Sequence, residues 1–536
     1  MGKGFFIKHI TQNRLIILVS IFFVLFYNYS FFDNVLTTYP WTEQNKGFLL
    51  SLPIVLVSIT ALFFTLLSSK FTTKPLLIIV LLLSSMTAYF MNTYQVVIDD
   101  SMIRNTLQTD TKEAMDLFSF KQVLYFLFLG LLPAFLVYKT PIHYLSFNAS
   151  LWEKSKQILL LLSIAILAIF IFSKHYTSFA REHKPLRYSA NPSYWIYSVG
   201  NYIYKTFNST PIEVKALGTD AKVNRNLNTL PKLVILVVGE AVRADHLALN
   251  GYDKNTTPKL SQEDIINFPN VYACGTSTAE SVPCMFSIYD KEDYSYKKGI
   301  GTENILDVLN HTGEVSVLWR DNNSDSKGVA LRVPYEYYKS PLNNTICIED
   351  ECRDEGMLVG LDTYIQKQNS NDILIVLHQM GNHGPAYFKR YTKAYEKFTP
   401  VCQTNQLEQC TKEEISNAYD NAILYTDDFL TKTIDLLKKY EHTHQTAMLY
   451  MSDHGESLGE KGIYLHGLPY FMAPDAQTHI AALAWFSTTL KKSKNIATMD
   501  ANKKYTQDNL FHTLLGLFDV ETKVYKPKLD IFNAGK

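Results

Sequence analysis

The stretch LVILVVGE, Leu233 to Glu240, joins a continuous apolar run to an acidic residue. A short apolar run without polar alternation is typical of a parallel strand that is buried on both faces. VSVLW (315–319), ILIVLH (373–378) and AMLYMS (447–452) have the same character, and amphipathic stretches such as 413–440 lie between them. This alternation predicts an α/β domain with a mostly parallel central sheet covered by helices on both faces.

Residues that can bind a metal stand at or just after the ends of these strands. They are Glu240, His378, His383, Asp453, His454 and His466. Ligands of an open parallel sheet bind at the carboxyl ends of its strands, so several of these side chains should converge there. Carboxylates with imidazoles suit zinc, and manganese is a less favoured alternative. We expect Glu240, Asp453 and His454 to be metal ligands at a catalytic site with room for a reacting oxygen.

The first third of the chain has a different character. It contains five apolar runs that approach the roughly 20 residues needed to cross a bilayer: Leu15–Phe32, Phe48–Leu67, Pro75–Met91, Val123–Val137 and Ile158–Phe172. The first run is too long for a cleavable signal peptide, and no small-residue cleavage site follows it. Lysine and arginine before the first run and in alternate loops place the N-terminus in the cytoplasm and everything after Lys174 outside.

Cysteine placement agrees with this orientation. All six cysteines lie in the part that is expected outside: Cys274, Cys284, Cys347, Cys352, Cys402 and Cys410. Close, even-numbered cysteines in an oxidising compartment indicate disulfides. Several connectivities are open, but the spacing favours 274–284, 347–352 and 402–410, and no CxxC spacing supports a zinc cluster.

The patterns therefore predict three regions: a transmembrane domain of five helices at 1–173, bridging segments at 174–230, and a metal-dependent catalytic domain at 231–536. The aromatic-rich stretch 192–207 favours a helix in the membrane interface, because amphipathic rings settle at the headgroup level. A formal net charge of zero argues against a nucleic-acid partner.

The loop ACGTSTAESVPCMFS, Ala273 to Ser287, brackets several hydroxyls with two cysteines. A threonine or serine hydroxyl is a weak nucleophile near neutral pH, and coordination to a metal lowers its pKa. The loop is thus suited to present a nucleophile to the expected metal, although these residues alone do not select which hydroxyl reacts.

Six stretches carry a resemblance to a known family: VVGEAVRADHLALNGY, CGTSTAESVPCMFS, WRDNNSDSKG, HQMGNHGP, YDNAILYTDDF and SDHGESLGEKGIYLHG. Together they resemble the membrane-anchored phosphoethanolamine transferases of the alkaline phosphatase/sulfatase superfamily. The similarity is greatest to the group that modifies lipid A, which includes the enzymes of mobile colistin resistance. Five spans followed by a cysteine-paired outer domain extend the resemblance over nearly the whole chain.

The resemblance implies a role for each site residue. Thr278 would be the nucleophile and the fourth ligand of one zinc, beside Glu240, Asp453 and His454. His383 and His466 would bind the substrate phosphate or assist the leaving group, and could hold a second zinc. The remaining substrate-binding candidates are Asn105, Thr109, Glu113, Asn323, Lys327 and His378. Asp245 and His246 are expected to be structural, and Glu280 has no assigned role.

The implied reaction moves phosphoethanolamine from phosphatidylethanolamine to a phosphate of lipid A through a covalent intermediate on Thr278, releasing diacylglycerol. The enzyme would be a monomer in the bacterial inner membrane with its catalytic domain in the periplasm, and it would confer polymyxin resistance. Alternatives are a phosphoglycerol transferase of the same superfamily, or transfer to a core sugar or a protein. A sulfatase is disfavoured because its modified nucleophile needs a C/S-x-P-x-R context, whereas Cys284 is followed by MFSI. A membrane-tethered binding module would leave the convergent ligands unexplained.

Overall fold

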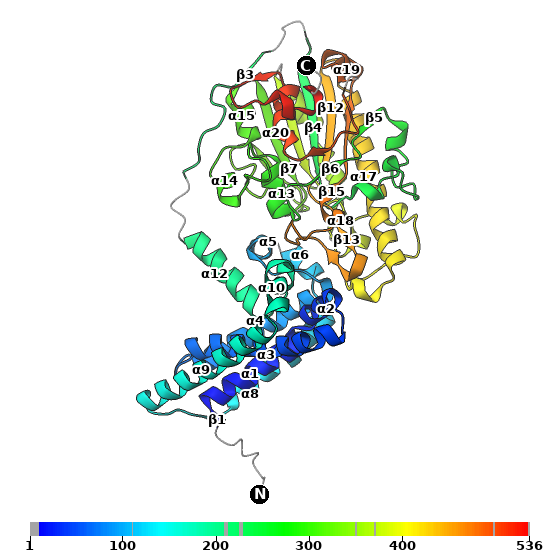
Figure 1. Cartoon of the computed structure of the whole chain (residues 1–536). Helices are drawn as coiled ribbons and strands as arrows, with labels where there is room; N and C mark the ends of the chain where they lie inside the picture. Colours follow the sequence, from blue (N-terminus) through cyan, green and yellow to red (C-terminus); the bar gives the residue numbers. More distant parts are fainter. Residues whose placement is uncertain are drawn as a thin grey trace. The chain divides into compact units, whose positions relative to one another are not determined.

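The computed structural model describes residues 10–109, 111–207, 213–224, 229–348, 351–368, 371–496 and 499–533. The chain divides into two compact units, Met1–Ile103 with Phe118–Asn208, and Arg104–Leu117 with Ser209–Lys536. We call them the helical unit and the sheet unit. Figure 1 shows the helices of the first mainly in blue to cyan and the layered second mainly in green to red.

The described part of the helical unit holds four helices that are long and apolar enough to cross a membrane. They are α3 (Glu43–Leu67), α4 (Thr73–Tyr94), the stretch Phe120–Lys139 and α9 (Phe147–Ile171). The third of these is continuous from α7 (Phe120–Leu124) through a π-helical segment (Tyr125–Leu131) to α8 (Leu132–Lys139). Each of these four helical stretches contains one of the last four predicted spans, except that α9 ends at Ile171, one residue before the end of the fifth predicted span.

The first predicted span is bent. Helix α1 (Gln12–Tyr27) and helix α2 (Tyr29–Thr38) meet at 62° and qualify as a span only as a pair. Asn28 lies between them, and its buried side chain donates to the carbonyl oxygens of Phe23 (3.0 Å) and Asn191 (2.7 Å). A side-chain amide that bonds to the backbone competes with the helical ladder, which accounts for the break. The prediction of five spans therefore holds when the bent pair is counted as one.

Three shorter helices complete the helical unit: α10 (Ser173–Arg181), α11 (Lys184–Tyr188) and α12 (Ser193–Phe207). Helix α12 corresponds to the aromatic-rich stretch, buries Trp195 and exposes Tyr197, Tyr204 and Phe207. A membrane-interface role for α12 stays a prediction. The division between the units at Asn208 lies inside the expected bridging region, whereas Arg104–Leu117, expected in the transmembrane domain, groups with the sheet unit.

The sheet unit is built on a sheet with seven described strands in the order β5-β16-β12-β4-β11-β7-β8. Strands β4 (Lys232–Gly239), β11 (Asp372–His378), β12 (Gln445–Ser452), β7 (Val315–Asp321) and β8 (Tyr335–Tyr337) run parallel. Strands β16 (Ala482–Phe486) and β5 (Ile265–Asn267) close one edge in antiparallel pairing. The mostly parallel sheet predicted from the apolar runs is confirmed.

Strand β4 is central because it is buried along its whole length. Its alternate residues Val234, Leu236 and Val238 join one core cluster with residues of α13 (Thr278–Met285), α15 (Ile305–His311) and α20 (Asn509–Leu517). The long helix α17 (Lys412–Lys438) packs against β12, and a capping box of Thr411 and Glu414 begins it. Because β4 lies between β11 and β12, the residues that follow these three strands meet at one edge.

Candidate active site and metal centre

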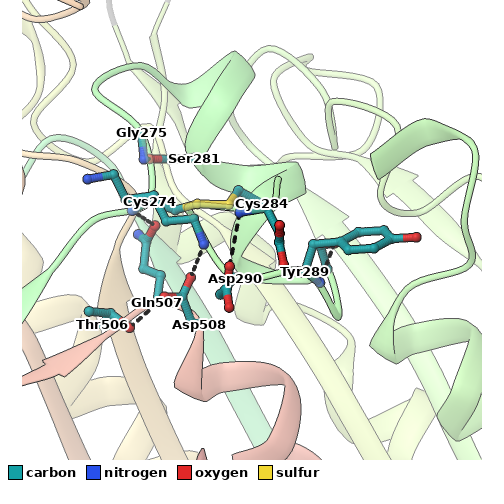
Figure 2. Close-up of a disulfide and its surroundings, with 12 residues drawn as sticks. Cys274, Gly275, Ser281, Cys284, Tyr289, Asp290, Thr506, Gln507 and Asp508 are labelled. Carbon is teal, nitrogen blue, oxygen red and sulfur yellow. Dashed lines mark hydrogen bonds between the residues drawn. A yellow bond between two sulfur atoms is a disulfide. The ribbon is translucent and has the colours of Figure 1, made fainter. Parts of the chain in front are cut away.

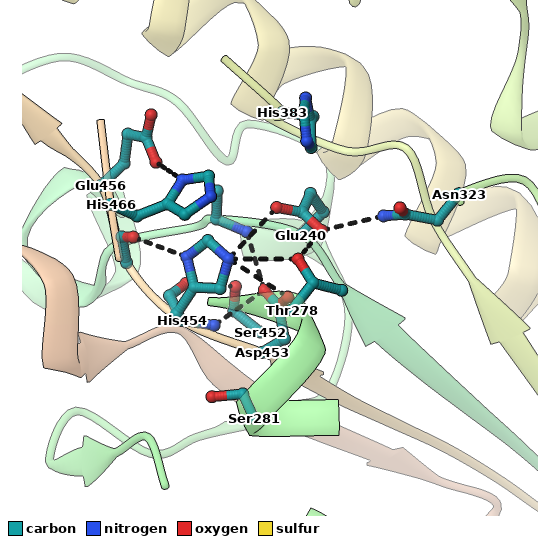
Figure 3. A network of polar contacts seen from close by, with 12 residues as sticks. Glu240, Thr278, Ser281, Asn323, His383, Ser452, Asp453, His454, Glu456 and His466 are labelled. Carbon is teal, nitrogen blue, oxygen red and sulfur yellow. Dashed lines mark hydrogen bonds and ion pairs between the residues drawn. The ribbon is translucent and has the colours of Figure 1, made fainter. Parts of the chain in front are cut away.

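Three buried candidate ligands meet where β4 and β12 end. Ser452 is paired with Gly239 in the sheet, so Glu240 and Asp453 follow neighbouring strands at the same level. Ligand atoms of Glu240, Asp453 and His454 all lie within 4.8 Å of one another, and none of the three residues is accessible to solvent. Figure 3 shows the three side chains turned toward a common point. The structure thus brings together the three residues expected from the strand ends, in a group that could hold a metal ion.

Thr278 is the fourth member of this cluster. It is the first residue of α13, and its Oγ1 donates to Glu240 Oε2 at 3.0 Å and lies 3.3 Å from His454 Nε2. The side chain is nearly buried, so the hydroxyl is held in a fixed place. The first turn of a helix also presents free backbone N–H groups and a positive dipole end, which favour a developing oxyanion or a phosphate.

The disulfide joins Cys274, in the loop before α13, to Cys284 near the end of that helix (Figure 2). The amide of Cys274 donates to Gln507 Oε1 at 2.7 Å. The Nε2 of Gln507 donates in turn to the carbonyl oxygens of Ser452 (2.9 Å) and Asp453 (2.7 Å). Gln507 therefore ties the hydroxyl loop to the strand end that carries the candidate ligands Asp453 and His454. Nothing in the sequence indicated this residue, because its partners lie more than 50 positions away.

The structure joins the other cysteines as Cys347–Cys352 and Cys402–Cys410, the pairs that the spacing favours. We predict that replacing Cys274 and Cys284 together with alanine lowers the free energy of unfolding by about 3 kcal/mol, since the cross-link no longer restricts the unfolded chain. Transfer should fall as well when it is measured well below the new melting temperature, because the loop that positions Thr278 is released. Full activity at that temperature would show that the disulfide serves stability alone.

The buried donor set fits a metal ion. Asp453 Oδ2 is buried, accepts no hydrogen bond from a described residue and lies 3.4 Å from His454 Nε2. Burial lowers the pKa of His454 to about 4, so the ring is neutral at physiological pH, as a metal ligand must be. Its Nδ1 lies 2.8 Å from the carbonyl oxygen of Gly455, which fixes the proton there and leaves the Nε2 lone pair toward the cluster. Two close buried carboxylates are costly unless a cation compensates them.

A second polar group adjoins the first. His466 Nδ1 lies 2.7 Å from Glu456 Oε2, and Tyr387 donates to Glu456 Oε1 at 2.7 Å. Burial raises the pKa of the Tyr387 phenol well above its usual value, so it remains a donor. The ring of His466 lies 4.2 Å from that of His454 and 6.1 Å from that of His383. His454, Glu456 and His466 could also hold a metal. Glu456 was not singled out from the sequence, although it stands in the DHGES stretch.

The predicted pocket residues take different places. Asn323 is buried and donates from Nδ2 to Glu240 Oε2 (2.8 Å) and to the carbonyl of Gln379 (2.8 Å), so it holds the side chain of Glu240 in position. Lys327, with φ of 50°, donates from Nζ to Ser324 within its own turn. His378 is buried at the end of β11, where its Nδ1 lies 2.9 Å from Asp321 Oδ2. Asp321 also accepts from the indole of Trp319.

Of the expected ethanolamine-binding residues, Asn105 lies in α5 (Asp100–Gln108), whose part from Arg104 onward belongs to the sheet unit. Thr109 directly follows α5, and Glu113 lies in α6 (Thr111–Asp116). Thr109 donates to the carbonyl of Asn105 at 2.8 Å. Glu113 belongs to α6, and its side chain lies outside the described part of the structure.

Three acidic or basic residues near the site have other surroundings. Asp245 pairs with Arg243 at 2.7 Å, and His246 Nδ1 lies 2.7 Å from Asp420. Both contacts agree with the structural role expected for these residues. Glu280 lies on α13 and is half-buried, and its negative charge acts electrostatically on Lys291 and Tyr294. The sequence did not indicate these neighbours.

Comparison with known proteins places this site in a family. Residues 232–520 match the family model described as Sulfatase, and residues 56–207 match the one described as Phosphoethanolamine transferase EptA/EptB. The chain is 43% identical over 532 residues to Phosphatidylethanolamine transferase Mcr-1 of Escherichia coli, with 97% of each covered. It is 37% identical over 539 residues to Phosphoethanolamine transferase EptA of Escherichia coli strain K12, with 98% of each covered.

A solved structure shows the same similarity. The integral membrane protein lipooligosaccharide phosphoethanolamine transferase A (EptA) from Neisseria meningitidis superposes with a TM-score of 0.94 at 35% identity. The match covers 98% of this chain and 99% of that one. The chain therefore belongs to the EptA and Mcr family of phosphoethanolamine transferases, inner-membrane proteins with a sulfatase-type domain in the periplasm.

Proposed function

We propose that this protein transfers phosphoethanolamine from phosphatidylethanolamine to a phosphate of lipid A. The observation that carries the proposal is the position of Thr278 Oγ1, 3.0 Å from Glu240 and 3.3 Å from His454 in a buried cluster suited to a metal. The names of the relatives support both substrates: Mcr-1 is a phosphatidylethanolamine transferase, and the Neisseria protein is a lipooligosaccharide phosphoethanolamine transferase.

The first half-reaction forms a covalent intermediate on Thr278. Its Oγ1 attacks the phosphorus of the donor, the new O–P bond forms, and the bond from phosphorus to the glycerol oxygen breaks. Glu240 Oε2 already accepts the hydroxyl's hydrogen bond and is placed to receive its proton. Phosphoethanolamine then remains on Thr278 while diacylglycerol leaves.

The leaving oxygen needs a proton, which we assign to His466. Its Nδ1 lies 2.7 Å from Glu456 Oε2, and this carboxylate orients the imidazole in the site. His383, whose ring lies 6.1 Å from that of His466, is assigned to the substrate phosphate. In the second half-reaction an oxygen of a lipid A phosphate attacks the same phosphorus and forms a new O–P bond. The bond from phosphorus to Thr278 Oγ1 breaks, and the proton held by Glu240 returns to that oxygen.

The ion that we expect is zinc, held by Glu240, Asp453, His454 and Thr278. Two carboxylates, one neutral imidazole and a hydroxyl suit zinc better than manganese, which prefers more oxygen ligands. When bound, zinc would supply a positive charge that lowers the pKa of the Thr278 hydroxyl. His383 and His466 remain candidates for a second ion.

We also propose that Asn323 acts through Glu240, whereas Lys327, His378, Asn105, Thr109 and Glu113 are candidates for binding the donor headgroup. A monomer suffices for the reaction, since Glu240, Thr278, Asp453 and His454 all come from one chain. Sedimentation of the detergent-solubilised protein would test the monomer directly, and a stable dimer would contradict it.

Mass spectrometry of lipid A tests the function. Cells that express the protein should contain lipid A heavier by one phosphoethanolamine, and cells that express Thr278→Ala should not. The added ammonium reduces the negative charge of lipid A, so the same cells should tolerate polymyxins better. If lipid A were unmodified and phosphoethanolamine were found on a core sugar or a protein, that molecule would be the acceptor. Cleavage of phosphatidylglycerol alone would favour a phosphoglycerol transferase.

A further inference from the structure

A buried arginine connects the site to a segment that lies between two membrane helices in the sequence. Arg390 donates from Nε to the carbonyl oxygen of His383 at 2.7 Å. Its two terminal nitrogens donate to Asp116 Oδ2 (2.6 Å) and Glu351 Oε2 (2.8 Å). The Arg390 side chain is 2% exposed and that of Asp116 is 9% exposed. One guanidinium therefore joins the backbone of a candidate substrate-binding histidine to two carboxylates.

Asp116 is the last residue of α6, in the segment Arg104–Leu117, which we call the strap. In the chain the strap lies between α4 and α7, yet it packs as part of the sheet unit. Asp116 also accepts from Lys389 Nζ at 2.5 Å. At the other end of the strap, the Arg104 guanidinium lies 4.2 Å from the centre of the Tyr296 ring. Both ends are thus fixed to the sheet unit.

Two of the three disulfides brace the loops that hold the strap. Glu351, the second carboxylate on Arg390, stands next to Cys352. Asn405, within the loop closed by Cys402 and Cys410, donates from Nδ2 to the carbonyl oxygen of Asp116 at 2.8 Å. The disulfides Cys347–Cys352 and Cys402–Cys410 therefore lie next to residues that bind the strap.

The loop that carries His383 is held on its other side by independent contacts. The amides of Met380 and Gly381 donate to the buried Asp354 at 2.8 and 3.2 Å. The backbone amide of Asn382 donates to the carbonyl oxygen of Glu240 at 3.0 Å. The bond from Arg390 to His383 is the next anchor along this loop. The orientation of the planar guanidinium is set by the carboxylates that it binds, so its direction toward His383 depends on Asp116.

We propose that Asp116 is a positioning residue, which fixes His383 through Arg390 so that the site is fully formed only when the strap is bound to the sheet unit. This inference rests on the substrate-binding role proposed for His383. It gives the strap a function: a segment that lies between two membrane helices in the sequence determines the position of His383 in the candidate site. A displacement of about 1 Å of such a group can lower a rate roughly a hundredfold.

The test uses the full-length protein in vesicles that contain a fluorescent phosphatidylethanolamine, with diacylglycerol release as the readout. Asp116→Asn should lower kcat roughly ten- to a hundredfold, and Asp116→Glu should recover part of the loss because it retains the charge. Glu351→Gln removes the other carboxylate from Arg390, leaves the strap's own contacts in place, and should also lower kcat. A wild-type protein that releases no diacylglycerol would refute the proposed function instead.

The double variant separates positioning from general stability. In a His383→Ala background, Asp116→Asn should cause no further loss of kcat, since the residue that it positions is gone. Asp519→Asn is the matched control: Asp519 also joins two lysines, Lys232 (2.8 Å) and Lys494, in a partly buried cluster. Lys232 begins β4, so this cluster lies at the end of the strand opposite to Glu240. It should lose stability and keep its kcat. The inference is overturned if the two losses multiply in the double variant, or if Asp519→Asn lowers kcat as much as Asp116→Asn.

Discussion

Thr278→Ala is expected to lower transfer by at least about four orders of magnitude, because it removes the atom that forms the bond to phosphorus. The protein should still fold. The change deletes one hydroxyl that donates a hydrogen bond to Glu240, and the loss of such a bond costs on the order of 1 kcal/mol. Diacylglycerol release from phosphatidylethanolamine vesicles measures the first effect and thermal unfolding the second.

Thr278→Ser is the control for this variant. It keeps a hydroxyl at the start of α13 and should retain measurable transfer, reduced because the β-methyl group no longer restricts the rotamer. If alanine and serine variants were equally inactive, the hydroxyl itself would not be the reacting group. If the alanine variant retained transfer, the covalent route through Thr278 would be wrong.

Asp453→Asn is expected to remove metal binding and to lower kcat at least about a hundredfold, since changes one shell further from a metal already cost ten- to a hundredfold. The substitution keeps the shape of the side chain, and its Oδ1 can still accept from the amides of Ala241 (3.0 Å) and His454 (2.7 Å). Only the charge is lost. Zinc analysis of the purified variant measures the occupancy directly.

Stability supplies a second readout that does not depend on activity. Added zinc should stabilise the wild-type protein against unfolding, by about 2.7 kcal/mol at a hundredfold excess over the dissociation constant. The Asn variant should show no such gain. In chelator, however, the variant should be at least as stable as wild type, because Glu240 then lies beside an amide and not a second carboxylate. A variant that is less stable than wild type in chelator, yet still stabilised by zinc, would contradict this assignment.

The buried strands, the convergence of the residues at their ends and the disulfides could be predicted from short sequence patterns. The apolar run from Leu233 gave a buried parallel strand, and the residues beyond the strand ends converged because parallel strands end at one edge of a sheet. The close cysteine spacing predicted the three disulfides for a similar reason: short loops limit the partners.

Contacts between distant segments were beyond such patterns. The bend at Asn28 depends on the carbonyl of Asn191, 163 residues away. Gln507 acts through main-chain atoms, and such a contact leaves no pattern in the sequence. The strap was expected to belong with the membrane helices because it lies between two of them. Its attachment to the sheet unit rests on an ion pair across 274 positions, between Asp116 and Arg390.

Peptide mass mapping of the trapped enzyme tests the central claim most directly. The full-length protein is incubated with phosphatidylethanolamine without an acceptor, quenched, and digested. The account predicts one phosphoethanolamine on the peptide that contains Thr278, lost again when lipid A is added before the quench. An unmodified Thr278 peptide in a sample that has released diacylglycerol, or an adduct on a different residue, would contradict it.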